Sequence, residues 1–112
     1  MAENIEFHRA ARTGEVVPGE VTAVEVAGEK VALYNIEGVF FATCNVCSHA
    51  EAYLDDGWLD DDVVTCPVHG AEFSVRTGEA LTLPATKPIA TYPVRIEGDE
   101  ILVGLDASAQ TT

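Results

Sequence analysis

Apolar and polar residues alternate in short segments along this chain, and turn signals separate the segments about every 8 to 12 residues, a spacing typical of β-strands. The predicted strands cover residues 5–10, 21–26, 30–36, 39–43, 90–98 and 100–105, with brief strands at 62–65 and 71–75. Glycine-containing turns at 27–29, 37–38 and 98–99 predict tight hairpins. No window spaces its apolar residues as a helix of three turns requires. We therefore expect an all-β fold, an antiparallel β-sandwich of two or more packed sheets.

The segment 43–88 differs from the rest of the chain, because turn sequences such as DDG, LDDD, CPVHG and RTGE dominate it. It predicts a subdomain inserted into the β base of a single domain at 1–105, and the small polar residues 106–112 predict a flexible tail. A bound metal would explain how so turn-rich a segment becomes rigid.

Composition narrows the class of protein. The chain has 112 residues, of which 47% are hydrophobic, enough for one domain with a core. No apolar run approaches the roughly 20 residues that cross a bilayer, and the first residues do not resemble a signal peptide. We expect a cytoplasmic protein, where thiols stay reduced, so the odd count of three cysteines favours metal binding over disulfides.

The formal net charge of −13 argues against nucleic acid and anionic membranes as partners. Such a negative charge would steer the protein toward basic patches on protein partners. Five aspartates gather between the cysteine-containing segments, with Glu51 and Glu72 nearer to the cysteines; they are Asp55, Asp56, Asp60, Asp61 and Asp62. They could serve turn formation and solvation, or they could form an acidic docking patch that makes partner reduction sensitive to ionic strength.

Cysteine and histidine residues gather between positions 44 and 69, and only His8 stands apart. One grouping takes Cys44, Cys47, Cys66 and His69 as a C-x2-C…C-x2-H set, a spacing found in closed zinc sites. This grouping leaves His49 without a role.

A second grouping takes Cys47, His49, Cys66 and His69, so that each of two loops contributes one cysteine and one histidine. Two such loops could hold a two-iron cluster, with both thiolates on one iron and both imidazoles on the other. That is the ligation of a Rieske [2Fe–2S] centre. Only this grouping uses both histidines of the region.

The residues around these ligands resemble a known family. The stretches CSH, CPVHG and FSVRTG and the Pro-rich loop 84–88, within a likeness from 39 to 103, are similar to the soluble Rieske-type ferredoxins of bacterial aromatic-ring-hydroxylating dioxygenase systems, such as those for biphenyl, naphthalene and toluene. The resemblance implies the Rieske iron–sulfur fold and one [2Fe–2S] cluster. It implies a monomeric electron carrier, not an enzyme by itself, that takes electrons from an NAD(P)H-dependent flavoprotein reductase and gives them to a terminal Rieske non-haem iron oxygenase.

The resemblance also assigns roles to single residues. Cys47 and Cys66 would hold the inner iron, and His49 and His69 the outer iron, with the imidazoles as the electron gate and a reduction potential that falls at high pH. Gly70 would let the backbone turn beside the cluster. The segment LPATKP, residues 83–88, would cover the cluster. Cys44 would be no ligand but a partly buried thiol acting as a small apolar residue.

The expected reduction potential follows from the ligands and their neighbours. Two ferric ions, two sulfides and two thiolates sum to zero charge, so the potential lies above that of four-cysteine ferredoxins. High-potential relatives carry a disulfide between the ligand loops, where this chain has Ala52 and Val68. They also carry hydroxyl donors where this chain has Ala71 and Phe73. We therefore predict a potential toward the low end of roughly −150 to +300 mV.

Four further interpretations concern single residues. Trp58 is expected to pack beneath the inserted segment, and Tyr53 and Phe73 are expected in the core or over the cluster. Arg76 is expected to form a structural ion pair, and His8 is expected as a surface or packing residue.

Two other functions remain as alternatives. The chain could be the Rieske-like subunit of a nitrite reductase or of another oxygenase. It could also be a zinc-stabilised interaction module.

Overall fold

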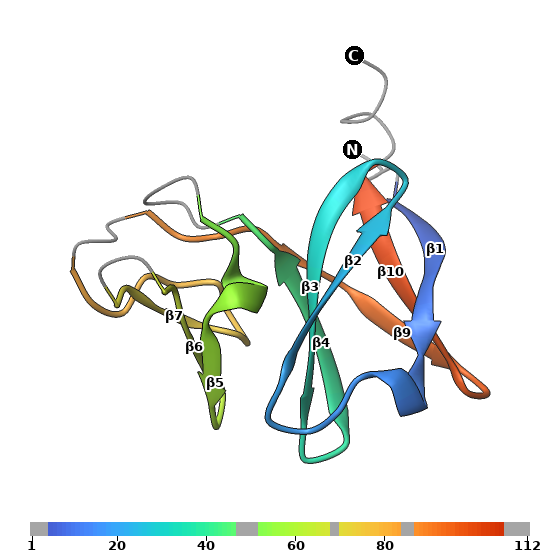
Figure 1. Cartoon of the computed structure of the whole chain (residues 1–112). Helices are drawn as coiled ribbons and strands as arrows, with labels where there is room; N and C mark the ends of the chain where they lie inside the picture. The colour runs from blue at the N-terminus through green and yellow to red at the C-terminus, as the bar shows by residue number, and fades with distance from the viewer. Residues whose placement is uncertain (1–4, 47–51, 68–69, 84–86, 107–112) are drawn as a thin grey trace.

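A computed structural model describes residues 5–46, 52–67, 70–83 and 87–106 of the chain (Figure 1). The strands are β1 (Ile5–Arg12), β2 (Val21–Val26), β3 (Glu29–Ile36), β4 (Val39–Cys44), β5 (Trp58–Asp60), β6 (Val63–Thr65), β7 (Glu72–Ser74), β8 (Thr91–Tyr92), β9 (Val94–Glu97) and β10 (Glu100–Asp106). The helical elements of the described residues are two short 3-10 turns, η1 (Thr13–Glu15) and η2 (Leu54–Asp56). The predicted all-β class is confirmed. No helix in these ranges is long and apolar enough to cross a membrane.

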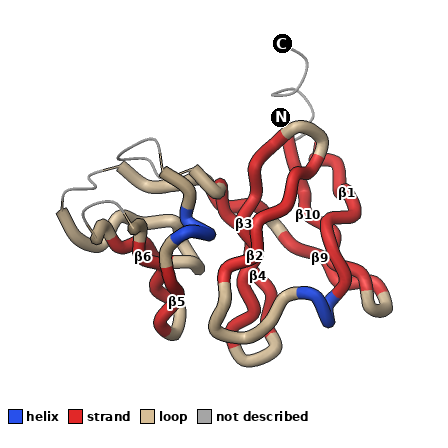
Figure 2. Tube along the Cα trace, viewed as in Figure 1, coloured by secondary structure: helices blue, strands red, loops and turns tan. Residues whose placement is uncertain are grey.

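The strands form three antiparallel sheets, in the orders β1-β10-β9, β2-β3-β4-β8 and β5-β6-β7. The first two of these sheets stand together, and the third, β5-β6-β7 (the small sheet), lies to one side of them, next to the four-stranded sheet (Figure 2). This arrangement confirms the predicted packing of antiparallel sheets.

Strand β3 is buried on both faces, because it lies between two hydrophobic cores. Val31 and Leu33 point into the core shared with β10, and Ala32 and Tyr34 point into the core shared with the small sheet. All four side chains have no exposed surface. A strand that is buried on both faces reads as a continuous apolar run rather than an alternating one, and VALY is such a run.

The predicted hairpins are confirmed, with one shift of boundary. Val26 pairs with Glu29, so the first turn consists of Ala27 and Gly28 alone, with φ angles of 50° and 86°. Positive φ at both turn residues matches the twist of the flanking strands, and glycine adopts it without a steric cost. Glu29, expected in the turn, begins β3.

The single strand predicted over residues 90–98 is wrong, because the chain divides there between two sheets. Thr91 and Tyr92 (β8) pair with β4, whereas β9, from Val94 onward, pairs with β10. Pro93 lies at the crossing, and its carbonyl oxygen accepts a hydrogen bond from Gly104 N at 2.9 Å. Proline has no N–H to donate to a ladder, so it favours a position where one pairing ends and another begins.

Two aromatic residues, Trp58 and Tyr53, are more exposed than the sequence predicted. Leu59 faces inward with Phe73, which is fully buried as predicted. Trp58 precedes Leu59 on β5 and therefore faces the opposite side, where it is 56% exposed. Its predicted place beneath the inserted segment is wrong. Tyr53 is 43% exposed and therefore lies outside the core, whereas the next residue, Leu54, is buried. The other place expected for Tyr53, over the cluster, stays a prediction.

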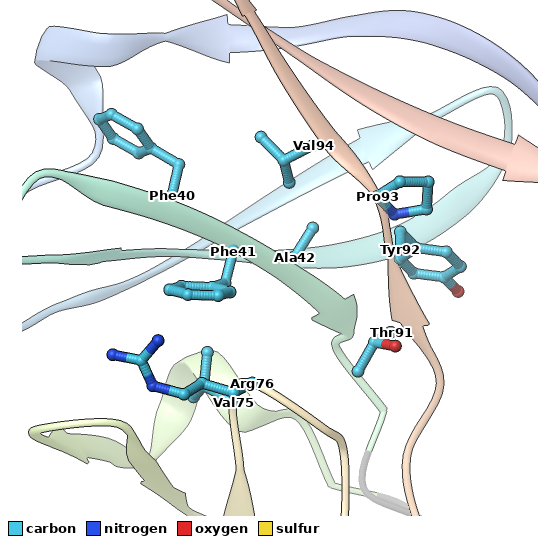
Figure 3. Close-up of a pocket in the computed structure, with 9 residues that line it drawn as sticks. All are labelled: Phe40, Phe41, Ala42, Val75, Arg76, Thr91, Tyr92, Pro93 and Val94. Atoms are coloured by element: carbon cyan, nitrogen blue, oxygen red, sulfur yellow. The ribbon is translucent and has the colours of Figure 1, made fainter.

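Arg76 forms the predicted structural ion pair and also contacts the four-stranded sheet. Its Nε lies 3.0 Å from Oδ2 of Asp62, and its guanidinium carbon lies 5.0 Å from the ring centroid of Phe41 on β4. Figure 3 shows the guanidinium beside the Phe41 ring. Both side chains line a hollow with a volume of about 340 Å³. His8 on β1 is partly buried, with Nε2 3.9 Å from Oε1 of Glu6, which agrees with a packing residue.

Candidate metal centre

Cys66 is the proposed ligand whose surroundings the structure describes. It follows β6 directly and has no exposed surface. Cys47, His49 and His69 lie outside the described residues, and so does Val68, but the residues on either side of these ligand positions are described. Within the described ranges, no three side chains of the types that bind metals lie together.

The second ligand segment, residues 67–70, is closed at its base by a backbone hydrogen bond. Cys66 N donates to the carbonyl oxygen of Ala71 at 2.7 Å, where β6 ends and β7 begins. Gly70 has a φ of 72°, a left-handed conformation that a β-carbon disfavours. This conformation agrees with the turning role expected for Gly70.

The first ligand segment, residues 47–51, is closed in a similar way. Val46 and Tyr53 form an isolated antiparallel bridge across its ends. Just outside that bridge, Asn45 and Asp55 exchange side-chain hydrogen bonds: Nδ2 of Asn45 donates to Oδ1 of Asp55 at 2.9 Å, and Asp55 N donates to Oδ1 of Asn45 at 3.0 Å. The sequence interpretation missed Asn45, and it named Asp55 only among the aspartates that could serve turn formation or docking. The available signal was the preference of Asn and Asp for local bonds to turn backbones.

The described surroundings fit an iron–sulfur cluster held between these two segments. Ala52 directly follows the first segment and Ala71 the second, and both pack with Cys66 in one apolar core. Small side chains at both positions leave room for an inorganic group, and a buried thiolate donor suits iron. Ala71 and Phe73 are fully buried and bear no hydroxyl group, which agrees with the low reduction potential expected from the sequence.

The segment expected to cover the cluster, residues 83–88, is described at its ends. Ile89 N donates to the carbonyl oxygen of Gly78 at 2.8 Å, and Leu81 N donates to that of Glu72 at 2.8 Å. Leu83 is 79% exposed. Residues 84–86, on which the covering role depends, lie outside the described residues.

Cys44 ends β4 as an ordinary strand residue. Its N–H donates to the carbonyl oxygen of Ala90 at 2.8 Å, and its Sγ accepts a bond from Val46 N at 3.4 Å. The thiol is partly buried, as predicted.

Two tyrosines near this end of β4 have perturbed acidities. Burial raises the pKa of Tyr34 well above its usual range, although its hydroxyl forms a 2.8 Å hydrogen bond with Oγ1 of Thr43. Burial, together with the charge of an ionised Cys44, raises the pKa of Tyr92 to about 12. Both phenols therefore stay neutral at physiological pH.

The family model of the Rieske [2Fe-2S] domain matches residues 6–93. Together with the three-sheet fold and the two closed ligand segments, this match defines the class: the chain belongs to the Rieske [2Fe–2S] domain family. Its cofactor is a Rieske-type [2Fe–2S] cluster, and the zinc-module interpretation is not retained.

Within the family, the chain is similar to ferredoxins of aromatic dioxygenase systems. It is 46% identical over 99 residues to the ferredoxin component of biphenyl 2,3-dioxygenase from Rhodococcus jostii (strain RHA1), covering 88% of this chain and 92% of that protein. Among solved structures, the Sphingomonas yanoikuyae B1 ferredoxin matches with a TM-score of 0.85 and 37% identity, covering 89% of this chain and 99% of that one.

A second similar structure comes from a complex of reduced oxygenase and oxidized ferredoxin in carbazole 1,9a-dioxygenase. It has a TM-score of 0.82 and 33% identity, covering 87% of this chain and 91% of that one. These relatives are named as electron-transfer components, which agrees with the expectation that the chain is not an enzyme by itself. They favour the dioxygenase ferredoxin over the nitrite reductase alternative.

Proposed function

We propose that Cys47, His49, Cys66 and His69 bind one [2Fe–2S] cluster, through which the chain carries single electrons. The donor is a flavoprotein reductase supplied by NAD(P)H, and the acceptor is the terminal Rieske non-haem iron oxygenase of an aromatic-ring dioxygenase system. The observation that carries this proposal is the pair of ligand segments, each closed at its base beside the buried Cys66.

The residues of this chain have three tasks in that function. The thiolate of Cys66 enters the cluster from the apolar side, where burial keeps water away. His49 and His69 are the proposed ligands on the side that faces the partners. Ala71 and Phe73 supply no hydroxyl donors, which keeps the potential low and so favours the transfer of electrons from the cluster to the oxygenase. The carrier is a cytoplasmic monomer in this proposal.

Matched serine variants test the ligand assignment. Cys47→Ser and Cys66→Ser should each abolish the visible absorption of the cluster, because a hydroxyl is a poor substitute for a thiolate on iron. Cys44→Ser should keep the colour and two irons per chain, which absorption spectra and iron analysis would measure.

A colourless wild-type protein with one zinc per chain would overturn the cluster and the carrier function together. A coloured wild-type protein that loses its cluster in Cys44→Ser would overturn the ligand assignment alone. On reduction with dithionite, the cluster of each chain should take up one electron.

A further inference from the structure

Asn45 joins the β base to both sides of the first ligand segment. Its N–H donates to the carbonyl oxygen of Lys30 on β3 at 3.0 Å, and its carbonyl oxygen accepts a bond from Leu54 N at 2.7 Å. Its side-chain amide makes the two bonds to Asp55 described above. Asn45 is only 4% exposed, so four hydrogen bonds converge on one buried residue.

The far side of the segment is equally well anchored. Leu54, between Tyr53 and Asp55, is fully buried in the core that contains Cys66. The bond from Asn45 Nδ2 to the carboxylate of Asp55 is of the charge-assisted kind, which is stronger than a bond between neutral groups. Asp55 itself is exposed, but removing it would leave the buried side-chain amide of Asn45 without its carboxylate partner.

We infer that Asn45 and Asp55 form a clamp that positions the first ligand segment, so that Cys47 and His49 meet the iron ions without strain. Asn45 lies two residues before Cys47, and Asp55 lies six residues after His49. Fixing both ends of so short a connection restricts the conformations of the residues between them. The two residues are positioning residues rather than ligands, and their role rests on the proposed function.

A clamp that positions the ligands should affect the cluster itself, whereas a residue that only stabilises the fold should not. If it holds the ligands in place, loosening it should speed the loss of iron and broaden the spectrum of the reduced cluster, because the ligand geometry becomes variable. A residue that only stabilises the fold would lower the melting temperature without changing either property.

Asn35 offers a matched control in the β base. It is also a buried asparagine, 9% exposed, and its side chain also makes one bond of each kind: Nδ2 donates to the carbonyl oxygen of Val16 at 3.1 Å, and Oδ1 accepts from Gly38 N at 2.8 Å. Asn35→Ala therefore removes the same chemistry far from the ligand segments in the sequence.

The experiment compares Asn45→Ala with Asn35→Ala in the cluster-containing protein. The measurements are the rate of iron transfer to a chelator, the electron paramagnetic resonance spectrum after reduction, and the melting temperature. We expect Asn45→Ala to lose iron about tenfold faster than the wild type and to broaden the spectrum. Asn35→Ala should lower the melting temperature with an unchanged spectrum. Wild-type iron loss and a wild-type spectrum in Asn45→Ala would overturn the clamp.

Two further variants keep the test decisive if Asn45→Ala does not fold. Asp55→Asn preserves a possible acceptor and removes only the charge, so it should accelerate iron loss less than Asn45→Ala does. The exchange Asn45→Asp with Asp55→Asn restores one donor and one acceptor across the pair, so it should recover slow iron loss relative to Asn45→Asp alone, in which two carboxylates face each other. An exchange variant no better than that single variant would overturn the reciprocal bonding.

The spectrum of the wild-type protein shows whether a negative result concerns the clamp or the proposed function. A wild-type protein without a Rieske spectrum would contradict the function, whereas a normal wild type with an unaffected Asn45→Ala would contradict only the clamp.

Discussion

Ala71 accepts the hydrogen bond that closes the second ligand segment, and its own side chain is fully buried beside Cys66. A hydroxyl at such a position would be left to donate to sulfur, because it could not reach water. Donation to the sulfurs stabilises the reduced cluster, which carries more negative charge. The absence of a hydroxyl at Ala71 and at Phe73 therefore lowers the expected potential.

The substitution Ala71→Ser should raise the reduction potential. A hydrogen bond with a net value of roughly 0.5–1.5 kcal/mol corresponds to a rise of about 20–65 mV for a one-electron couple. The measurement is a redox titration followed by visible absorption. The control is Ala42→Ser, at a buried alanine of the other core, which should lower stability and leave the potential unchanged. A wild-type potential above about +100 mV, within the roughly −150 to +300 mV of such centres, would contradict the argument.

Single residues also mark the limit of what the sequence could predict. The ligand set stays a prediction, which the sequence could offer because its cysteines and histidines lie close together in the chain. The side on which Trp58 faces was not predictable, because a three-residue strand carries too little alternation to fix which residues point inward. The partners of Asn45 were equally hidden, since they depend on how the chain returns after residues 47–51.

At the scale of elements, a strand with a continuous apolar sequence was predicted more accurately than a segment in which apolar residues alternate with polar residues and proline. Strand β3 was predictable because burial on both faces gives it a continuous apolar sequence. The segment 90–98 was mispredicted because Pro93 was taken as part of one strand, although its missing N–H separates β8 from β9.

The insertion of a subdomain at 43–88 into the β base remains a prediction about domain organisation. Of the predicted tail, residues 106–112, only Asp106 is described, as the end of β10.

The close approach of the backbone at Gly78 and Ile89 provides a test of the fold beside residues 83–88, the segment expected to cover the cluster. A β-carbon added to Gly78 would collide with the carbonyl oxygen of Ile89, and the φ of 79° is itself unfavourable for other residues. Gly78→Ala should therefore lower the free energy of unfolding by more than the roughly 1–2 kcal/mol that a left-handed alanine costs. Gly19→Ala is the control, because Gly19 has a φ of 85° and open space around it. Urea denaturation measures both, and equal losses would mean that the contact with Ile89 is unimportant.

At the scale of the whole molecule, two apolar cores meet across β3, and the residues of that strand couple the β base to the small sheet. Tyr34 belongs to the core on the small sheet's side, together with Cys66 and Phe73. A change of charge at Tyr34 would therefore be felt both by the base and by the sheet that carries the second ligand segment.

The raised pKa values of Tyr34 and Tyr92 predict that alkali destabilises the molecule. In the unfolded chain a tyrosine ionises near pH 10, whereas in the folded chain burial keeps both phenols protonated to higher pH. Above pH 10 the folded state thus binds more protons than the unfolded state, so the free energy of unfolding falls as pH rises, up to about 12 for Tyr92 and beyond that for Tyr34. Below pH 10 the two states bind equally many protons at these groups, and stability should not depend on them.

The variant Tyr34→Phe should flatten this alkaline loss, because it removes the more strongly shifted phenol. Its stability at neutral pH should fall by only about 1 kcal/mol, since Oγ1 of Thr43 still donates to the carbonyl oxygen of Cys44 at 3.0 Å. Tyr53→Phe, which removes an exposed phenol, is the matched control and should keep the wild-type pH dependence. Urea midpoints measured from neutral pH into the alkaline range would decide the matter. If Tyr34→Phe lost stability with pH as steeply as Tyr53→Phe does, the buried phenol of β3 would not be the group that limits folding in alkali.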